Sequence, residues 1–270
     1  MNAPQVSGQP VEALPLRVEV QGALATVVIE RSHKRNAMTQ AMWRDMAALF
    51  RRFDGDGTLR GVILRGAGAV FSAGADIGEF RQARAGADAA LAYDADVDAC
   101  CRAIEECAKP VIAVVEGPAV GGGAALAMAC DFRFAGPAAS FAVPAARLSI
   151  ALSEYNTNKL IALCGLAQAR RILLTAQPVG AERALRIGLV DGLSDAPLDD
   201  ALALADTIGR NAPLSIRAAK LACASLASVH GDDASRERVR EAIRRAADSL
   251  DAGKARQAFL ERREPVFSGD

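Results

Sequence analysis

The sequence has little histidine, no excess of charge of either sign and no long apolar run. Only two histidines occur in 270 residues, so a mechanism that needs histidine as acid, base or metal ligand is poorly supplied. Lys plus Arg and Asp plus Glu each total 32, so no overall field attracts nucleic acid or an anionic membrane. The longest apolar stretches, such as 121–130, are well short of the ~20 residues that a membrane-spanning helix needs. We therefore expect a cytoplasmic protein with neither a membrane nor a nucleic-acid partner.

Common catalytic signatures are missing as well. The six cysteines form no C-x-x-C pair and have no histidine at a zinc-ligand spacing, which predicts small buried side chains and no metal site. The chain contains no P-loop, no G-x-S-x-G, no H-E-x-x-H and no G-x-G-x-x-G after a strand. These absences argue against nucleotide-binding and serine-hydrolase functions.

The apolar pattern predicts a mixed α/β core. A hairpin is expected around Gln21-Gly22, and 39–53 has the period of an amphipathic helix. The order helix, strand, glycine-rich loop, helix then occurs twice. The expected strands are 16–20, 24–30, 62–64, 111–115, 132–135 and 140–143.

Three parts are expected along the chain. Residues 1–15 form a flexible tail without the basic start and apolar block of a signal peptide. Residues 16–196 form the α/β core, and 197–270 form a helical C-terminal region in which Pro213 restarts a helix. Within that region 236–245 interleaves Arg with Glu, which is typical of a solvated face and argues against RNA binding.

Two loops rich in small residues, 71–77 and 117–123, each lie between an expected strand and an expected helix. The first N–H groups of a helix have no intrahelical partners and lie at the positive end of its dipole. Two such donors on a thioester oxygen would stabilise an enolate, and one donor typically lowers the barrier by ~3–4 kcal/mol. The loops therefore indicate a site where negative charge develops.

The residues in and around these loops resemble the enoyl-CoA hydratase/isomerase (crotonase) superfamily over essentially the whole chain. The segments that carry the resemblance are Asn36-Ala37-Met38, 71–77, 109–113, 117–123, 127–131, 174–176, 184–190 and 259–267. The resemblance implies an α/β crotonase-like spiral of ββα units with a helical C-terminal trimerisation region, and hence a homotrimer or a dimer of trimers. It also implies an acyl-CoA substrate and no cofactor, since coenzyme A is part of the substrate.

The resemblance also implies the site residues. By position, the N–H groups of Ala75 and Gly122 would be the oxyanion donors. Further substrate contacts would be Lys34, Arg35, Ala37, Ala73, Asp76, Ile77, Val120 and Gly121. The two basic positions fall where the family contacts the phosphates and adenine of the coenzyme, with a merely solvated loop as the alternative. Asp76 with Glu79 three residues later also fits a helix capping box, which needs no role in binding.

The sequence departs from the family at the acid and base positions. Hydratases of the family use two glutamates, and the matching positions here are Ala125 and Ala145. An alanine neither activates water nor carries a proton, roles that each contribute roughly 10²–10⁴ in rate. We therefore expect isomerisation of an enoyl-CoA by a proton shuttle rather than hydration. A decarboxylase and a catalytically silent acyl-CoA-binding subunit are the alternatives.

Glu154 is the candidate base because it is the only carboxylate in 149–157, where isomerases of the superfamily place a single acid. Comparison without gaps puts Ser153 on that position. In the alternative interpretation Ser153 caps a helix and Glu154 complements the helix dipole, which would lower the pKa of the carboxyl and weaken it as a base. Tyr155 is either a proton donor or a packing residue.

Overall fold

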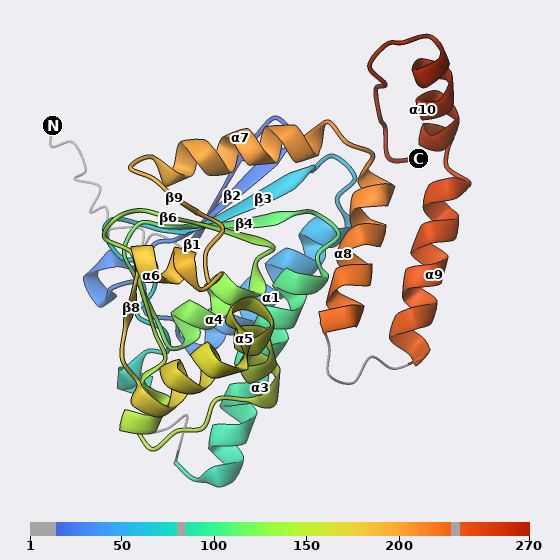
Figure 1. The fold of residues 1–270 in the computed structure, drawn as a ribbon. Coiled ribbons are helices and arrows are strands. Elements are labelled where there is room, and N and C mark those ends of the chain that lie inside the picture. Colours follow the sequence, from blue (N-terminus) through green and yellow to red (C-terminus); the bar gives the residue numbers. More distant parts are fainter. Residues whose placement is uncertain (1–14, 80–84, 228–232) are drawn as a thin grey trace, which may run out of the picture.

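Helices cover both faces of one large sheet (Figure 1). The computed structural model describes residues 15–79, 85–227 and 233–270, so the tail expected at 1–15 lies outside the described residues except for Pro15. The strands are β1 (Leu16–Gln21), β2 (Leu24–Ile29), β3 (Gly61–Gly66), β4 (Val111–Val115), β5 (Pro118–Val120), β6 (Phe132–Ala135), β7 (Ser140–Ala142), β8 (Val179–Gly180) and β9 (Gly192–Leu193). The α-helices are α1 (Gln40–Gly55), α3 (Ala87–Glu106), α4 (Gly122–Ala129), α5 (Glu154–Thr175), α6 (Ala181–Arg186), α7 (Pro197–Gly209), α8 (Pro213–Ala227), α9 (Asp233–Ala247) and α10 (Leu250–Leu260). Short 3₁₀ turns are η1 (Ser32–Lys34), η2 (Ile77–Glu79) and η3 (Pro144–Arg147).

The larger sheet has the strand order β1-β2-β3-β4-β6-β9. β1 and β2 pair antiparallel as the predicted hairpin, with Gln21 opposite Leu24, and the remaining pairs are parallel. A second sheet, β5-β7-β8, is short. The sequence prediction placed six strands correctly but missed β5, β8 and β9, which are only two or three residues long and therefore carry too little pattern to detect.

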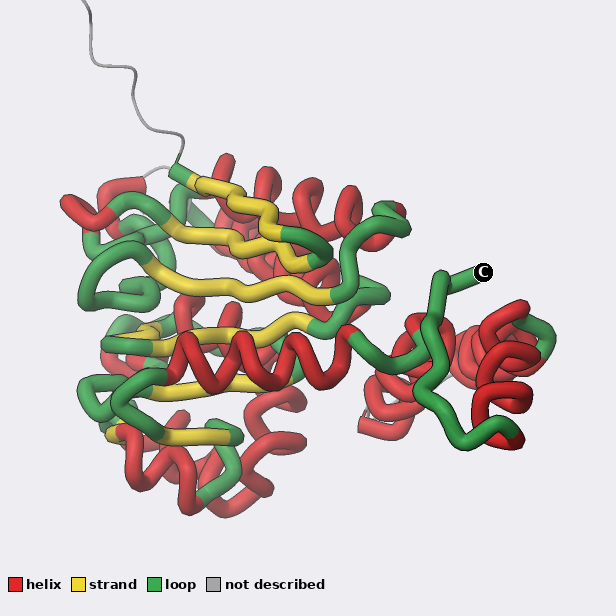
Figure 2. The backbone as a smooth tube through the Cα atoms, turned by 90° about the horizontal axis from the view of Figure 1, so that it is seen from above, coloured by secondary structure: helices red, strands yellow, loops and turns green. Residues whose placement is uncertain are grey.

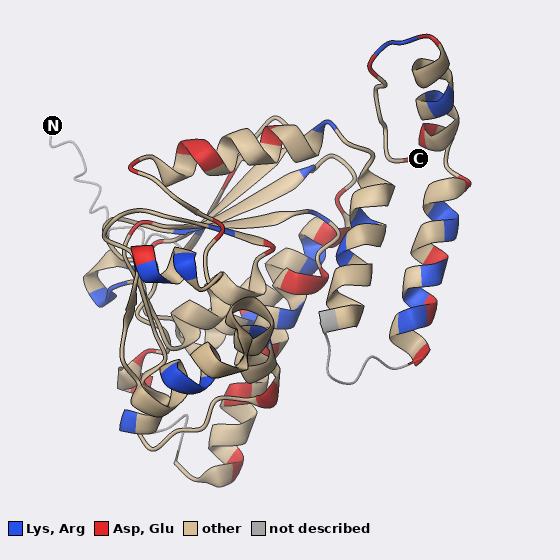
Figure 3. Cartoon of the chain, viewed as in Figure 1, with Lys and Arg blue, Asp and Glu red and all other residues tan. Residues whose placement is uncertain are grey.

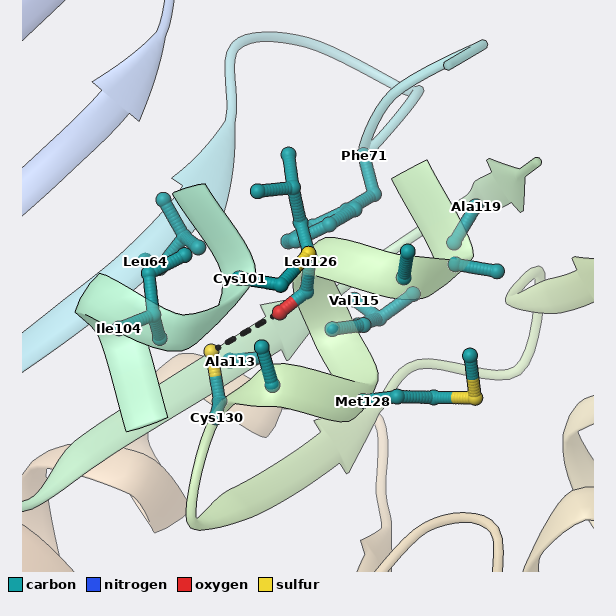
Figure 4. Close-up of a cluster of buried hydrophobic side chains, with 14 of the residues drawn as sticks. Leu64, Phe71, Cys101, Ile104, Ala113, Val115, Ala119, Leu126, Met128 and Cys130 are labelled. Atoms are coloured by element: carbon teal, nitrogen blue, oxygen red, sulfur yellow. Dashed lines mark hydrogen bonds between the residues drawn. The ribbon is translucent and has the colours of Figure 1, made fainter. Parts of the chain in front are cut away.

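The central strands are apolar on both sides because helices cover both faces of the sheet. Every residue of β4 is buried, and its side chains alternate between two apolar clusters. Figure 4 shows part of the first cluster, in which Ala113 and Val115 of β4 lie with Leu126 of α4 and Ile104 of α3. Cys130, directly after α4, donates from Sγ to the Leu126 carbonyl at 3.3 Å. The thiol is thus a packed core group, as predicted.

The second cluster lies on the opposite face, under α7. It contains Ile63, Ile112 and Val114 of the sheet with Ala201 and Ala205 of α7. The sequence-based division placed this helix in the C-terminal region that starts at residue 197. In the structure it is a layer of the core, because its buried face is the second cover of the sheet.

Helices α8–α10 lie beside the layers of the sheet rather than on them (Figures 1 and 2). Lys220 of α8 ties this group to the core, donating from Nζ to Asp131 Oδ2 at 2.5 Å and to the Lys109 carbonyl at 2.8 Å. Arginines are interleaved with Asp and Glu along α9 (Figure 3), and Arg240 is paired to Glu237 at 2.8 Å. In the described part of the chain, no helix is both long and apolar enough to cross a membrane.

Candidate active site

The two loops singled out in the sequence lie against each other. Val120 N donates to the Ser72 carbonyl at 2.9 Å, and Ser72 N donates to the Pro118 carbonyl at 3.2 Å. Ser72 and Ala119 thus form an isolated parallel bridge that joins the loop after β3 to β5. The loops 71–77 and 117–123, about fifty residues apart in sequence, therefore lie side by side in the structure.

Glycine is required where these turns meet. Gly74 has φ +85°, and a Cβ placed on it would lie 2.4 Å from the Val120 carbonyl oxygen and 3.0 Å from Gly122 N. A Cβ on Gly123 would lie 2.3 Å from the Ser72 carbonyl oxygen. Such distances are too short for a side chain, so the close approach of the two loops depends on hydrogen in place of Cβ.

Residues 35–38 hold the loop 71–77 in place through hydrogen bonds. Met38 N donates to the Gly74 carbonyl at 2.7 Å, and Asp76 N donates to the Met38 carbonyl at 2.9 Å. The fully buried Asn36 supports this segment, because its Nδ2 donates to the carbonyls of Ala67 at 2.9 Å and Val70 at 2.6 Å. The Ala75 amide lies between two backbone groups that are both tied to Met38.

The N–H groups of Ala75 and Gly122 are available to a ligand. Neither donates a hydrogen bond within the described residues. A Cβ placed on Gly122 would lie 3.7 Å from Ala75 N, so the two amides belong to adjacent turns. Gly122 begins α4, and Gly121 before it has φ +54° and provides no side-chain cap. The arrangement offers two donors, one of them at a helix N-terminus, to one small anionic group.

One largely apolar cavity contains both amides. The residues that line it are Trp43, Ala73, Ala75, Ile77, Tyr93, Asp94, Val97, Asp98, Val120, Gly121, Gly122, Ala125, Val143, Pro144, Ala145, Leu148, Ile150, Ala151, Leu152, Ser153 and Asn156. Ala125 and Ala145, the two positions matched to hydratase glutamates, are both in the wall. The methyl groups at these positions can hold an apolar chain but cannot activate water.

The predicted site residues divide into two groups. The cavity is lined by Ala73, Ala75, Ile77, Val120, Gly121 and Gly122. It does not include Lys34, Arg35, Ala37, Asp76 or Glu154. Lys34 and Arg35 are exposed around η1, whereas Ala37 is 7% exposed and packed behind the first loop.

Asp76 and Glu79 have structural partners, but not the predicted ones. Asp76 Oδ1 accepts from Gly78 N at 2.9 Å, and its Oδ2 accepts from Arg31 Nη1 at 2.7 Å. The Arg31 guanidinium holds the pKa of the Asp76 carboxyl below its usual range. Glu79 accepts from Gln40 N, the first amide of α1, at 2.8 Å. Glu79 therefore fixes the loop to α1 and Asp76 fixes it to Arg31, instead of the two acids forming a capping box with each other.

The structure does not support Glu154 as the base. Its side chain is exposed at the first position of α5, outside the cavity. Ser153 is the cap of this helix, since its Oγ accepts from Asn156 N at 3.2 Å. Tyr155 also lies outside the cavity: its hydroxyl donates to Glu105 Oε2 at 2.6 Å, and Arg102 lies over its ring. The Ser153 cap is the one considered from the sequence, and Tyr155 contacts α3 instead of the cavity.

Two carboxylates that the sequence interpretation missed do line the cavity. Asp94 and Asp98 lie one turn apart on α3, on the face that also carries Tyr93 and Val97 into the cavity wall. Like charges four residues apart destabilise an isolated helix, so this spacing is the signal in the sequence that could have drawn attention to them. Among the described residues, no group of three or more His, Cys, Asp or Glu side chains is placed to hold a metal ion.

Comparisons with known proteins agree with this geometry. Residues 19–270 match the family model described as enoyl-CoA hydratase/isomerase. A probable enoyl-CoA hydratase of Mycobacterium bovis is 33% identical over 251 residues, which cover 92% of this chain and 96% of that protein. The mitochondrial Δ(3,5)-Δ(2,4)-dienoyl-CoA isomerase of Pongo abelii is 32% identical over 208 residues, covering 72% of this chain and 63% of the isomerase.

A crystal structure of an enoyl-CoA hydratase/carnithine racemase from Magnetospirillum magneticum superimposes with a TM-score of 0.87 at 33% identity, covering 96% of this chain and 97% of the other. The crotonase-like α/β fold that the sequence resemblance implied is therefore confirmed.

Proposed function

Because the chain belongs to the enoyl-CoA hydratase/isomerase family, we propose that it isomerises the double bond of an enoyl-CoA thioester by proton transfer. The N–H groups of Ala75 and Gly122 bind the thioester oxygen. Removal of a proton from the carbon next to the thioester carbonyl sends the electron pair into the acyl chain and onto this oxygen, where the two N–H groups stabilise it. Return of the proton to the far end of the original double bond moves that bond by one position, and no atom is gained or lost.

The observation that carries this proposal is the pair of amides, which have no hydrogen-bond acceptor in the described part of the chain. They share a cavity with Ala125 and Ala145, which occupy the positions of the two glutamates of the hydratases. Proton transfer within the substrate needs an oxyanion site and one titratable group. Hydration also needs a group that activates water, and the two methyls do not supply it. The named dienoyl-CoA isomerase among the relatives supports isomerisation as a reaction of the family.

Lys34 and Arg35 are proposed to bind the phosphates of the coenzyme. Both are exposed and lie outside the acyl cavity, as expected of residues that contact the hydrophilic end of the substrate. The Arg35 carbonyl accepts from Ala73 N at 3.0 Å, so this basic segment is attached directly to the first loop.

We further propose that the protein assembles as a homotrimer or a dimer of trimers through α8–α10. The support is the position of these helices beside the core and their exposed apolar side chains. The most exposed of these are Leu226, Phe259 and Leu260, and Val266, in the segment after α10, is exposed as well.

A thioester panel in deuterium oxide tests the proposed reaction. The chain has a single tryptophan, Trp43, which lines the cavity, so its fluorescence reports binding of each thioester. We expect 2-enoyl- and 3-enoyl-CoA to bind and to interconvert, with deuterium entering the product, by mass spectrometry, to the extent that the carried proton exchanges with the solvent. Gain of one water by the enoyl thioester would contradict the proposal in favour of hydration. Loss of carbon dioxide from a malonyl-type thioester, without isomerisation, would support the decarboxylase, and binding without any conversion would support a silent subunit.

A further inference from the structure

The acyl cavity contains a carboxylate with the surroundings of an acid-base catalyst. Among the described residues that line it, the titratable side chains are Tyr93, Asp94 and Asp98. The Tyr93 hydroxyl accepts from Trp43 Nε1 at 2.9 Å and is fully buried. The two aspartates are the carboxylates among these groups, and a carboxylate is the kind of side chain that takes a proton from a carbon acid.

Asp98 is held in place from the neighbouring helix. Its Oδ1 accepts from Ser153 Oγ at 2.7 Å and from Asn156 Nδ2 at 2.7 Å. Within the described residues, Oδ2 receives no hydrogen bond. The cap of α5 thus fixes one oxygen of the carboxylate and leaves the other to contact a substrate.

Asn156 provides a second, independent indication of a ligand or a proton at this position. It is 3% exposed and lines the cavity, yet its Oδ1 has no hydrogen-bond partner. A buried acceptor without a donor is costly and calls for an explanation. A half-turn of the amide would present Oδ1 to Asp98 in place of Nδ2, which suits a carboxyl group that has taken up a proton. The same amide can therefore stabilise both protonation states of Asp98.

The electrostatic surroundings also make the Asp98 carboxylate a stronger base than an ordinary aspartate. Burial raises the pKa of the Asp98 carboxyl, and the charge of Asp94 raises it further. The hydrogen bonds from Ser153 and Asn156 and the charge of Arg102 lower the pKa, but the net shift is upward. A carboxyl whose pKa lies closer to the pH of the solution exchanges protons with carbon acids more effectively than an ordinary surface aspartate.

We propose that Asp98 is the catalytic acid and base of the isomerisation, with Ser153 and Asn156 as its positioning residues. Asp98 takes the proton from the carbon next to the thioester carbonyl, becomes a neutral carboxylic acid, and returns the proton to the far end of the double bond. This inference rests on the proposed function, because it supplies the proton carrier that Glu154, outside the cavity, does not.

Asp98→Asn is the decisive variant, because the asparagine Oδ1 still accepts from Ser153 and Asn156 but the side chain no longer titrates. We expect turnover to fall roughly 10²–10⁴-fold while thioester binding by Trp43 fluorescence and the melting temperature change little. The matched control is Asp96→Asn, on the same helix but outside the cavity, where Asp96 pairs with Arg44 at 2.8 Å. This control should keep wild-type turnover.

The pH profile separates a chemical role from a structural one. The titratable or charged groups that interact with Asp98 in the described structure are Asp94, Cys101, Arg102 and Tyr155. Since the base must be ionised, wild-type turnover should fall as pH decreases through the raised pKa of Asp98, and Asp98→Glu should restore a titrating profile at reduced rate.

Three results would overturn the assignment. Asp98→Asn with wild-type turnover would exclude Asp98, and loss of turnover in Asp94→Asn alone would move the role one turn along α3. If the wild-type protein converts no thioester, the proposed function itself fails and the assignment fails with it. These outcomes are distinguishable because the wild-type measurement comes first.

Discussion

At the scale of single residues, the site depends on glycine, which has no Cβ atom. A Cβ on Gly122 would lie 2.9 Å from both Cη2 and Cζ2 of Trp43, whose ring is fully buried. The ring cannot retreat without displacing the core around it, so the backbone of Gly122 would have to move. This backbone carries the N–H group proposed to bind the thioester oxygen.

Gly122→Ala should therefore lower turnover more than it lowers stability. Displacement of one oxyanion donor costs ~10²–10³ in kcat, whereas overpacking costs ~1–3 kcal/mol in the free energy of unfolding. Steady-state kinetics and urea denaturation measure the two effects. Gly253→Ala in α10 is the control, because a Cβ there has nothing within 4 Å. Equal activity of both variants would contradict the role of Gly122.

Asn36→Ala tests the anchor behind the first loop. The asparagine side chain makes three bonds to backbone, two from Nδ2 and one in which Oδ1 accepts from Arg31 N at 3.0 Å. Its loss leaves buried groups unpaired at ~1–3 kcal/mol each, so we expect a decrease of roughly 2–5 kcal/mol in the free energy of unfolding. Urea denaturation gives the value, and a change below about 1 kcal/mol would show that water replaces the side chain.

At the scale of elements, the roles of α3 and α7 depend on the elements against which they pack. α3 packs against α1 and α4, which places its Tyr93–Asp98 stretch in the cavity wall. α7 covers the second face of the sheet through small residues, and Ala201 is fully buried there. Small side chains permit this close approach of helix to sheet, so enlarging them should separate the layers.

Ala201→Leu is expected to reduce the free energy of unfolding by ~1–3 kcal/mol, because the added methyl groups enter a filled interface. Ala203→Leu, two residues along the same helix but exposed, is the control and should change stability by less than about 0.5 kcal/mol. Chemical denaturation compares them. If both variants were equally stable, α7 would not be part of the cooperative core.

At the scale of the whole molecule, the C-terminal helices leave apolar side chains uncovered. Phe259 and Leu260 at the end of α10 are 83% and 82% exposed. Large apolar side chains left exposed at adjacent positions, such as these two, are typical of a contact with another subunit. This distribution agrees with the proposed assembly through α8–α10.

Phe259→Asp combined with Leu260→Asp should shift the protein toward the monomer, because each charge would have to be desolvated in the contact. Sedimentation velocity measures the state, and circular dichroism checks that the variant folds. Arg256→Asp, at another exposed position of α10, should leave the assembly intact. A wild-type protein that sediments as a monomer would contradict the assembly itself.

The local pattern of the sequence was sufficient for much of the fold. The hairpin, the buried strands Gly61–Gly66 and Val111–Val115, and the two loops of small residues follow from apolar period and from glycine placement. The motifs around those loops also indicated the family. Each of these features is encoded within a few neighbouring residues, so no knowledge of distant contacts was needed.

Tertiary structure decided which acid reaches the cavity and where α7 belongs. Glu154 and Asp98 both lie on helices with suitable neighbours, but only Asp98 faces the space shared by Ala75 and Gly122. Its partners Ser153 and Asn156 are more than fifty residues away in sequence, and the strands β3 and β4 that α7 covers are still more distant from that helix. Sequence alone predicted most of the elements and the two loops that carry the proposed amide donors, because these are properties of local backbone and small residues. The identity of the proton carrier depends on how separate helices pack, which no local pattern records.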